Sequence, residues 1–161
     1  EAMDDDNWAE WCFEFGYNIN DKLNGVMLPN TMALACQLHV PLHRSNHSNG
    51  QAEGAAYPKT VKSKLDPIAN DIKSGKYCSN PDALVNELND LSEFILKKVD
   101  QFKWTLTKDG KDYKAGGNGC AGVSSLTDKP ACACPKNRSH GLSKIKGTPL
   151  PRSMLPLKIG K

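Results

Sequence analysis

The sequence lacks the long apolar runs and the repeats that define membrane-spanning and fibrous proteins. Its longest uninterrupted apolar run, residues 32–36, is far shorter than the roughly 18 residues that a membrane-spanning helix needs. Glycine follows no fixed period and heptads are not sustained, which excludes collagen-like and coiled-coil chains. We therefore expect the 161 residues to form one globular domain of ordinary size.

The common catalytic motifs are missing as well. The chain has no Gly-x-Ser-x-Gly elbow, no Gly-Lys-Ser or Gly-Lys-Thr phosphate-binding loop, and no His-Glu-x-x-His pair. These absences favour a protein that binds rather than catalyses, and we expect no cofactor.

Six cysteines are spread over the chain, and only the last two are close together in sequence. They are Cys12, Cys36, Cys78, Cys120, Cys132 and Cys134. Zinc ligands usually come in close pairs, so we predict three disulfides and no structural metal, with the pairing left open. Disulfides are typical of exported proteins, which predicts a secreted, extracellular protein.

Two further features agree with export. Asn46-His47-Ser48 and Asn137-Arg138-Ser139 both match the glycan acceptor pattern. No charged and then apolar leader is present, as expected after removal of a signal peptide. We set residues 1–3 aside as a remnant of processing or cloning and expect residues 4–161 to form a single secreted domain.

Periodicity predicts a mixed α+β fold. Aromatic residues alternate along residues 11–19, which favours a half-buried strand, although Trp8, Trp11, Phe15 and Ile19 would also share one helical face. A second strand pair, a hairpin, is expected where Phe102, Trp104 and Leu106 alternate before a turn.

The helix signals lie between these segments. Asp66 and Pro67 predict the start of one helix, and Pro81 predicts the start of the main one. Along the main helix an apolar stripe runs from Leu84 to Val99. We therefore expect a single disulfide-stabilised domain with a small antiparallel sheet, one main helix and a long irregular C-terminal arm.

Charge is distributed unevenly along the chain. Residues 1–128 carry 13 Lys and Arg against 18 Asp and Glu, whereas residues 129–161 carry eight basic residues and no carboxylate. This basic arm is our candidate binding surface, through Lys136, Arg138, Lys144, Lys146 and Arg152. It has no interleaved aromatics and no apolar helical face, so we expect a host protein or an anionic surface component as partner rather than nucleic acid, and a monomeric protein. The alternative is that the arm folds back onto the acidic body.

Histidines supply the other candidate site. His39, His43 and His47 are spaced four apart, which on one helix would make a metal site, and this gives an alternative function as a metal-binding protein. Pro41 interrupts such a helix, so we expect exposed loop histidines instead. A second alternative is a secreted ribonuclease-like enzyme that pairs a histidine with another histidine or a glutamate. Its candidate residues are His39, His43, His47, His140, Glu10, Glu14 and Glu53.

In its composition the whole chain resembles the small secreted cysteine-rich effectors and toxins of plant-associated fungi. The resemblance rests on the size, the six spread cysteines and the surface rich in Lys and Gly. The short aromatic-x-Cys signature of the ribonuclease-like effectors is not cleanly present, because Trp11 directly precedes Cys12. The resemblance implies a virulence protein that binds a host macromolecule without catalysis.

Overall fold

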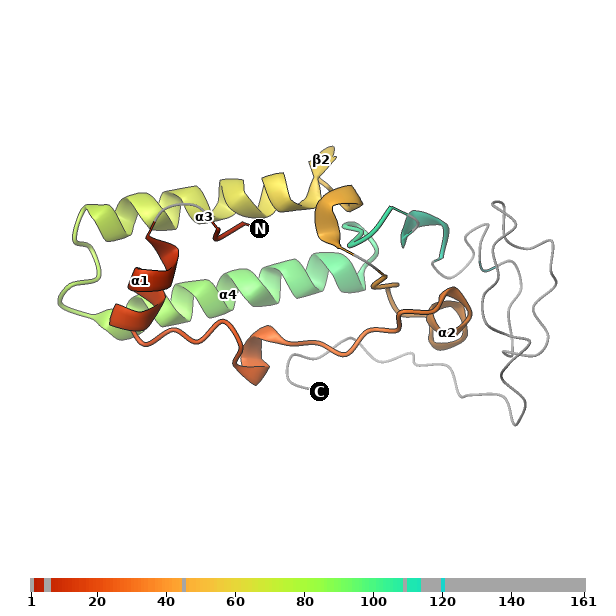
Figure 1. Ribbon diagram of the computed structural model, residues 1–161, viewed down its shortest axis with the longest axis horizontal. Coiled ribbons are helices and arrows are strands. Elements are labelled where there is room, and N and C mark those ends of the chain that lie inside the picture. Colours follow the sequence, from red (N-terminus) through yellow and green to blue (C-terminus); the bar gives the residue numbers. More distant parts are fainter. Residues whose placement is uncertain (1, 5–6, 45, 109, 114–119, 121–161) are drawn as a thin grey trace.

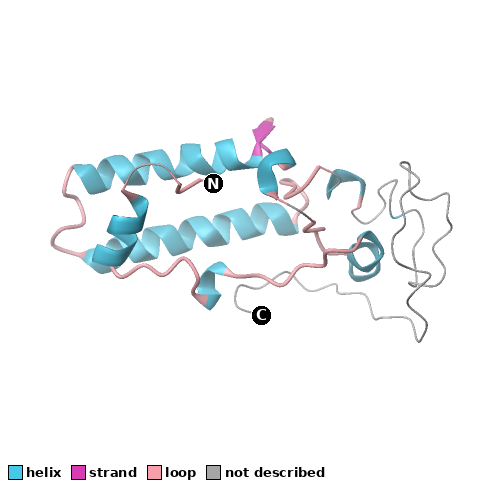
Figure 2. Cartoon of the chain, in the orientation of Figure 1, coloured by secondary structure: helices cyan, strands magenta, loops and turns pink. Residues whose placement is uncertain are grey.

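Two long antiparallel helices, α3 (Tyr57–Lys73) and α4 (Pro81–Asp100), form the body of the protein (Figure 1). The structure, a computed structural model, describes residues 2–4, 7–44, 46–108, 110–113 and 120. Within these residues it has four α-helices and one two-stranded antiparallel sheet (Figure 2). The expected α+β class is therefore confirmed, although several elements differ from their predicted positions. The predicted C-terminal arm lies outside the described residues.

The main helix was predicted correctly. α4 begins at Pro81, whose fixed φ and missing N–H suit the first turn of a helix. Leu84, Leu88 and Val99 are almost completely buried, so the predicted apolar stripe faces the core.

The other long helix begins nine residues before the predicted start at Asp66. α3 starts at Tyr57 with Pro58 in its first turn, and Pro67 lies inside the helix. The helix continues through Pro67 because apolar side chains on both sides of it are buried at helical spacing. These side chains are Leu65, Ile68 and Ile72.

The first aromatic segment is a helix, and the predicted strand is wrong. α1 (Trp8–Glu14) crosses the helix pair near the loop that joins α3 to α4 (Figure 1). Trp8 and Trp11, three residues apart, are buried against the core, whereas Phe13 is 90% exposed. A strand would have placed Phe13 on the same face as Trp11. The helical spacing of the two tryptophans, which buries both of them, therefore favours a helix over a strand in this segment.

The sheet is a short hairpin just before α3. β1 (Gln51–Ala52) pairs with β2 (Ala55–Ala56) in the register Gln51↔Ala56 and Ala52↔Ala55. Both turn residues, Glu53 and Gly54, have positive φ, as a two-residue type I′ turn requires.

The predicted hairpin at residues 102–113 is also wrong. Phe102, two residues after the end of α4, adopts a left-handed conformation with φ of 54°. Only one isolated bridge follows among the described residues, in which Thr105 and Gln51 exchange backbone hydrogen bonds of 2.9 Å. Trp104 is 2% exposed and packs in a core cluster with Ala52, Val99 and Leu106. The alternating pattern therefore reflects tertiary packing rather than a strand pair.

Shorter elements complete the described chain: η1 (Lys22–Asn24), α2 (Met32–Leu38), η2 (His47–Asn49) and η3 (Gly110–Asp112). η2 contacts α3, and in Figure 1 it lies beside β2, at the opposite end of the helix pair from α1. No helix in the described part of the chain has the length and apolar character needed to cross a membrane.

Candidate functional site

The loop between α2 and β1 carries three of the four histidines and is fixed by backbone hydrogen bonds. α2 ends at Leu38, and His39 follows in a left-handed conformation with φ of 55°. The His43 N–H donates to the Pro29 carbonyl at 2.9 Å, and the Gly50 N–H donates to the His47 carbonyl at 2.9 Å. As predicted from Pro41, no helix runs through the three histidines, but their side chains are half-buried and not exposed as we expected.

Two of these histidines form a close pair. Nε2 of His43 lies 2.7 Å from Nε2 of His47, and the ring centroids are 4.9 Å apart. At this distance one nitrogen donates the hydrogen bond and the other accepts it, so the two rings share one proton. Such a pair can take a proton from a nucleophile and return one to a leaving group.

The pair lines a cavity of about 480 Å³, within the range of small-molecule sites. The cavity extends from the histidines along α4 and the segment after η1. Its lining residues are Asn24, Gly25, Val26, Met27, Leu28, His43, His47, Tyr57, Ser92, Ile95, Leu96, Val99 and Leu106.

Tyr57 supplies a third polar group beside the pair. Its ring meets the His47 ring edge to face, with centroids 5.2 Å apart. Burial raises the pKa of the Tyr57 phenol to about 12. The phenol therefore stays protonated at neutral pH and can donate a hydrogen bond to a bound anion, but it cannot act as a base there.

Replacing Tyr57 by Phe is expected to leave the free energy of unfolding nearly unchanged at pH 7 and to make the variant the more stable protein at pH 11. The unfolded phenol ionises near pH 10 and the folded one near 12. The native chain therefore loses stability relative to the Phe variant as the pH rises from 10 towards 12, whereas below pH 10 this loss is absent. At pH 11 the difference amounts to about 1.4 kcal/mol. Urea unfolding of both chains at the two pH values checks this, and an equal difference at both would contradict it.

Asn24 fixes the opposite wall of the cavity to α4. Its Oδ1 accepts hydrogen bonds from the Tyr17 hydroxyl at 2.9 Å and from Ser92 Oγ at 3.0 Å. Its Nδ2 donates to the Asn18 carbonyl at 3.0 Å. No sequence motif marks Asn24, because both partners of Oδ1 depend on the tertiary fold.

The glutamates considered for an acid-base site do not join the histidine pair. Glu10 and Glu14 belong to α1, at the far end of the helix pair (Figure 1). Glu53 lies in the β1–β2 turn, with its carboxylate 3.2 Å from the Lys64 ammonium. His140 lies outside the described residues, as do the five basic residues chosen from the arm: Lys136, Arg138, Lys144, Lys146 and Arg152.

The three-histidine metal site is not assembled. Within the described ranges, no three or more His, Cys, Asp and Glu side chains gather as metal ligands. His39 is separated from the pair by the end of α2 and by Pro41. A divalent ion at the pair would find two imidazole nitrogens there and would have to complete its shell with water or substrate oxygens.

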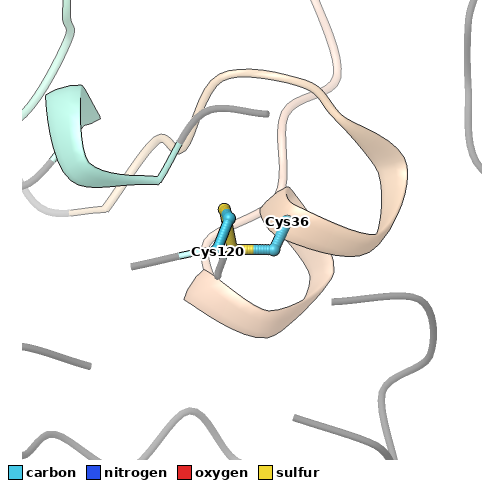
Figure 3. Close-up of a disulfide and its surroundings, with 2 residues drawn as sticks. All are labelled: Cys36 and Cys120. Atoms are coloured by element: carbon cyan, nitrogen blue, oxygen red, sulfur yellow. A yellow bond between two sulfur atoms is a disulfide. The ribbon is translucent and has the colours of Figure 1, made fainter. Parts of the chain in front are cut away.

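One disulfide joins the described parts of the chain, between Cys36 in α2 and Cys120 (Figure 3). Their Cα atoms are 5.2 Å apart. Cys12 and Cys78 are free thiols in the structure, which differs from the expected full set of bridges, and burial raises the pKa of the Cys12 thiol. Cys132 and Cys134 lie outside the described residues.

Residues 7–95, more than half of the chain, match the model of the AHH family, described as a nuclease family of the HNH/ENDO VII superfamily with conserved AHH. The chain belongs to this nuclease family. The match includes Asn24, both histidines of the pair, Tyr57 and most of α4. No curated protein and no solved structure matches the chain.

The family assignment corrects two expectations. The prediction of a non-enzymatic effector is wrong, and of the functions considered the nuclease alternative agrees with the family. The nuclease family also counts against our expectation that nucleic acid is not a partner. The absent motifs misled us, because none of them describes this kind of nuclease. Secretion and the resemblance to fungal effectors are untested by these findings and stay predictions.

The chain departs from the family in one respect. The family is described by a conserved AHH, yet the 161 residues contain no Ala-His-His tripeptide and no two adjacent histidines. Chemistry by histidine in the matched region must therefore come from His39, His43 or His47.

Proposed function

We propose that the protein is a nuclease that cleaves phosphodiester bonds at the His43–His47 pair. The observation that carries the proposal is the 2.7 Å contact between the two Nε2 atoms, at a cavity lined mostly by residues that match a nuclease family. Hydrolysis of a phosphodiester needs a base for the attacking oxygen, an acid for the leaving oxygen and a hydrogen-bond donor for the charge on the non-bridging phosphate oxygens.

The three side chains can divide these roles among them. The histidine whose Nε2 is unprotonated accepts the proton of the attacking hydroxyl or water. Its partner acts in the imidazolium form: it gives the shared proton to the leaving oxygen and is left as a neutral imidazole. The Tyr57 hydroxyl, protonated below its raised pKa, donates to a non-bridging phosphate oxygen. Because the nucleophile's proton replaces the one given up, the pair returns to its starting state after each turnover.

Incubation of the purified chain with fluorescently labelled DNA and RNA oligonucleotides tests this proposal. We expect cleavage products with defined ends, resolved on a denaturing gel. The reaction is run with EDTA and with added Mg²⁺ or Zn²⁺, because two imidazole nitrogens can also serve as metal ligands. Intact oligonucleotides under every condition would contradict the proposal.

A second candidate function, binding of nucleic acid without cleavage, is favoured by the missing Ala-His-His tripeptide. In that case the oligonucleotides would remain intact but would migrate more slowly with the protein on a native gel. The eight basic residues at 129–161 would attract the polyanion in either case, and the binding should weaken as salt is added.

A further inference from the structure

The cavity beside the histidine pair has an apolar wall that the chemistry of phosphodiester cleavage does not need. Two segments form this wall, residues 26–28 after η1 and residues 95–96 in α4. Their side chains are not fully buried, and Met27 is 82% exposed. The folded chain thus keeps aliphatic surface in contact with solvent at the very place where a substrate phosphate would bind.

The polar groups of this wall already have partners within the protein. Asn24 Oδ1 accepts two hydrogen bonds, and Ser92 Oγ lies within hydrogen-bonding distance of both Asn24 Oδ1 and the Leu88 carbonyl. The wall therefore offers apolar contact to a ligand, with few free donors or acceptors for hydrogen bonds to the ligand's polar atoms.

Among the described residues, no Lys, Arg, Asp or Glu lines the cavity. The described lining therefore offers apolar surface rather than a row of phosphate contacts. A base inside a duplex is stacked and paired, so it cannot enter a cavity of this kind unless it leaves the helix. An unpaired base has an apolar face free and needs no particular edge contact.

We propose that this cavity binds an unpaired nucleobase next to the scissile phosphate, so that the protein acts on single-stranded nucleic acid with little preference among bases. The proposal rests on the nuclease function stated above. The volume of about 480 Å³ leaves room for a base beside the phosphate site. The same histidines border the cavity, so a base seated in it belongs to a nucleotide that adjoins the reacting bond.

Two substrates of one sequence, a labelled single strand and its duplex, provide the first test. We expect at least tenfold higher kcat/KM on the single strand and similar values for four strands that differ only in the base at the mapped cleavage site. An abasic nucleotide, moved stepwise along the strand, should raise KM about tenfold at one position next to the cut. Equal rates on strand and duplex, or no sensitive abasic position, would overturn the proposal.

Variants of the apolar wall provide the second test. Met27→Ala combined with Leu96→Ala should raise KM for the single strand about tenfold while kcat changes less than threefold. Ile19→Ala combined with Leu23→Ala is the matched control, because these aliphatic side chains are 54% and 49% exposed and lie outside the cavity lining. Equal KM values for the two double variants would contradict the proposal, provided that thermal unfolding shows both to be folded.

Binding measurements separate this proposal from the nuclease function. Fluorescence anisotropy with a labelled single strand and its duplex needs no cleavage. If the strand is bound at least tenfold more tightly than the duplex and the wall variant loses this preference, the base site stands even when no cleavage is found. If cleavage occurs but the wall variant binds like the native chain, the nuclease function stands and the base site is wrong.

Discussion

Replacing His47 by Phe is expected to lower kcat for phosphodiester cleavage by roughly 10²- to 10⁴-fold, the usual contribution of a general acid or base. Phe keeps an aromatic ring against Tyr57, 5.2 Å away between centroids in the native chain, but removes the nitrogen that meets His43. Single-turnover rates with excess protein measure the effect.

His43→Phe should cost about as much as His47→Phe, and the double variant little more than either single one. Residues that share one proton act as a unit, so their losses do not add. His39→Asn is the control, because asparagine tolerates the left-handed conformation of His39, which lies outside the cavity lining. If the double variant loses kcat by the product of the two single losses, the 2.7 Å pair is not the reactive unit. An equal loss of kcat in His39→Asn would show the same.

Gly50→Ala is expected to lower the free energy of unfolding by about 2–3 kcal/mol or more, and cleavage with it. A Cβ at Gly50 would lie 2.4 Å from the Thr105 carbonyl oxygen and 2.8 Å from that of Leu106. Both are backbone atoms, so the two segments must separate to admit it. Because Gly50 directly follows η2, the shift also moves His47 away from His43.

Gly25→Ala is the matched control for this substitution. Its added Cβ would find only the Lys22 carbonyl oxygen, at 3.7 Å, and its φ of −106° suits alanine. Urea unfolding of the two variants and the native chain gives the comparison. A Gly50→Ala chain as stable as Gly25→Ala would mean that the loop is not held against residues 105–106.

The parts of the fold that the sequence predicted are those whose signals are local. Pro81 and the leucines of α4 lie within one continuous stretch, and the helix formed as expected. The prediction for α1 was wrong because its aromatic residues fit both the strand period and the helix period. Burial of Trp8 and Trp11 against the helix pair favours the helix. The supposed strand around Trp104 failed for a related reason, since its partners, Ala52 and Val99, come from elsewhere in the chain.

The candidate site shows the same division between local and long-range signals. The spacing of His43 and His47 drew attention to them, but in a loop that spacing does not fix a distance between rings. Their contact depends on the bond from His43 to Pro29 and on the bridge between Gln51 and Thr105. The sequence did not single out Tyr57, because one tyrosine at the start of a helix forms no pattern.

The bridge between Cys36 and Cys120 makes most of the described chain a closed covalent ring. The two cysteines are 84 positions apart, and the ring between them contains both long helices and the histidine pair. A protease that cuts any single peptide bond within the ring cannot release a fragment, because the two new ends remain on one molecule. Such a nicked protein would run as a single species on a denaturing gel without reductant and would separate into two pieces once reductant is added.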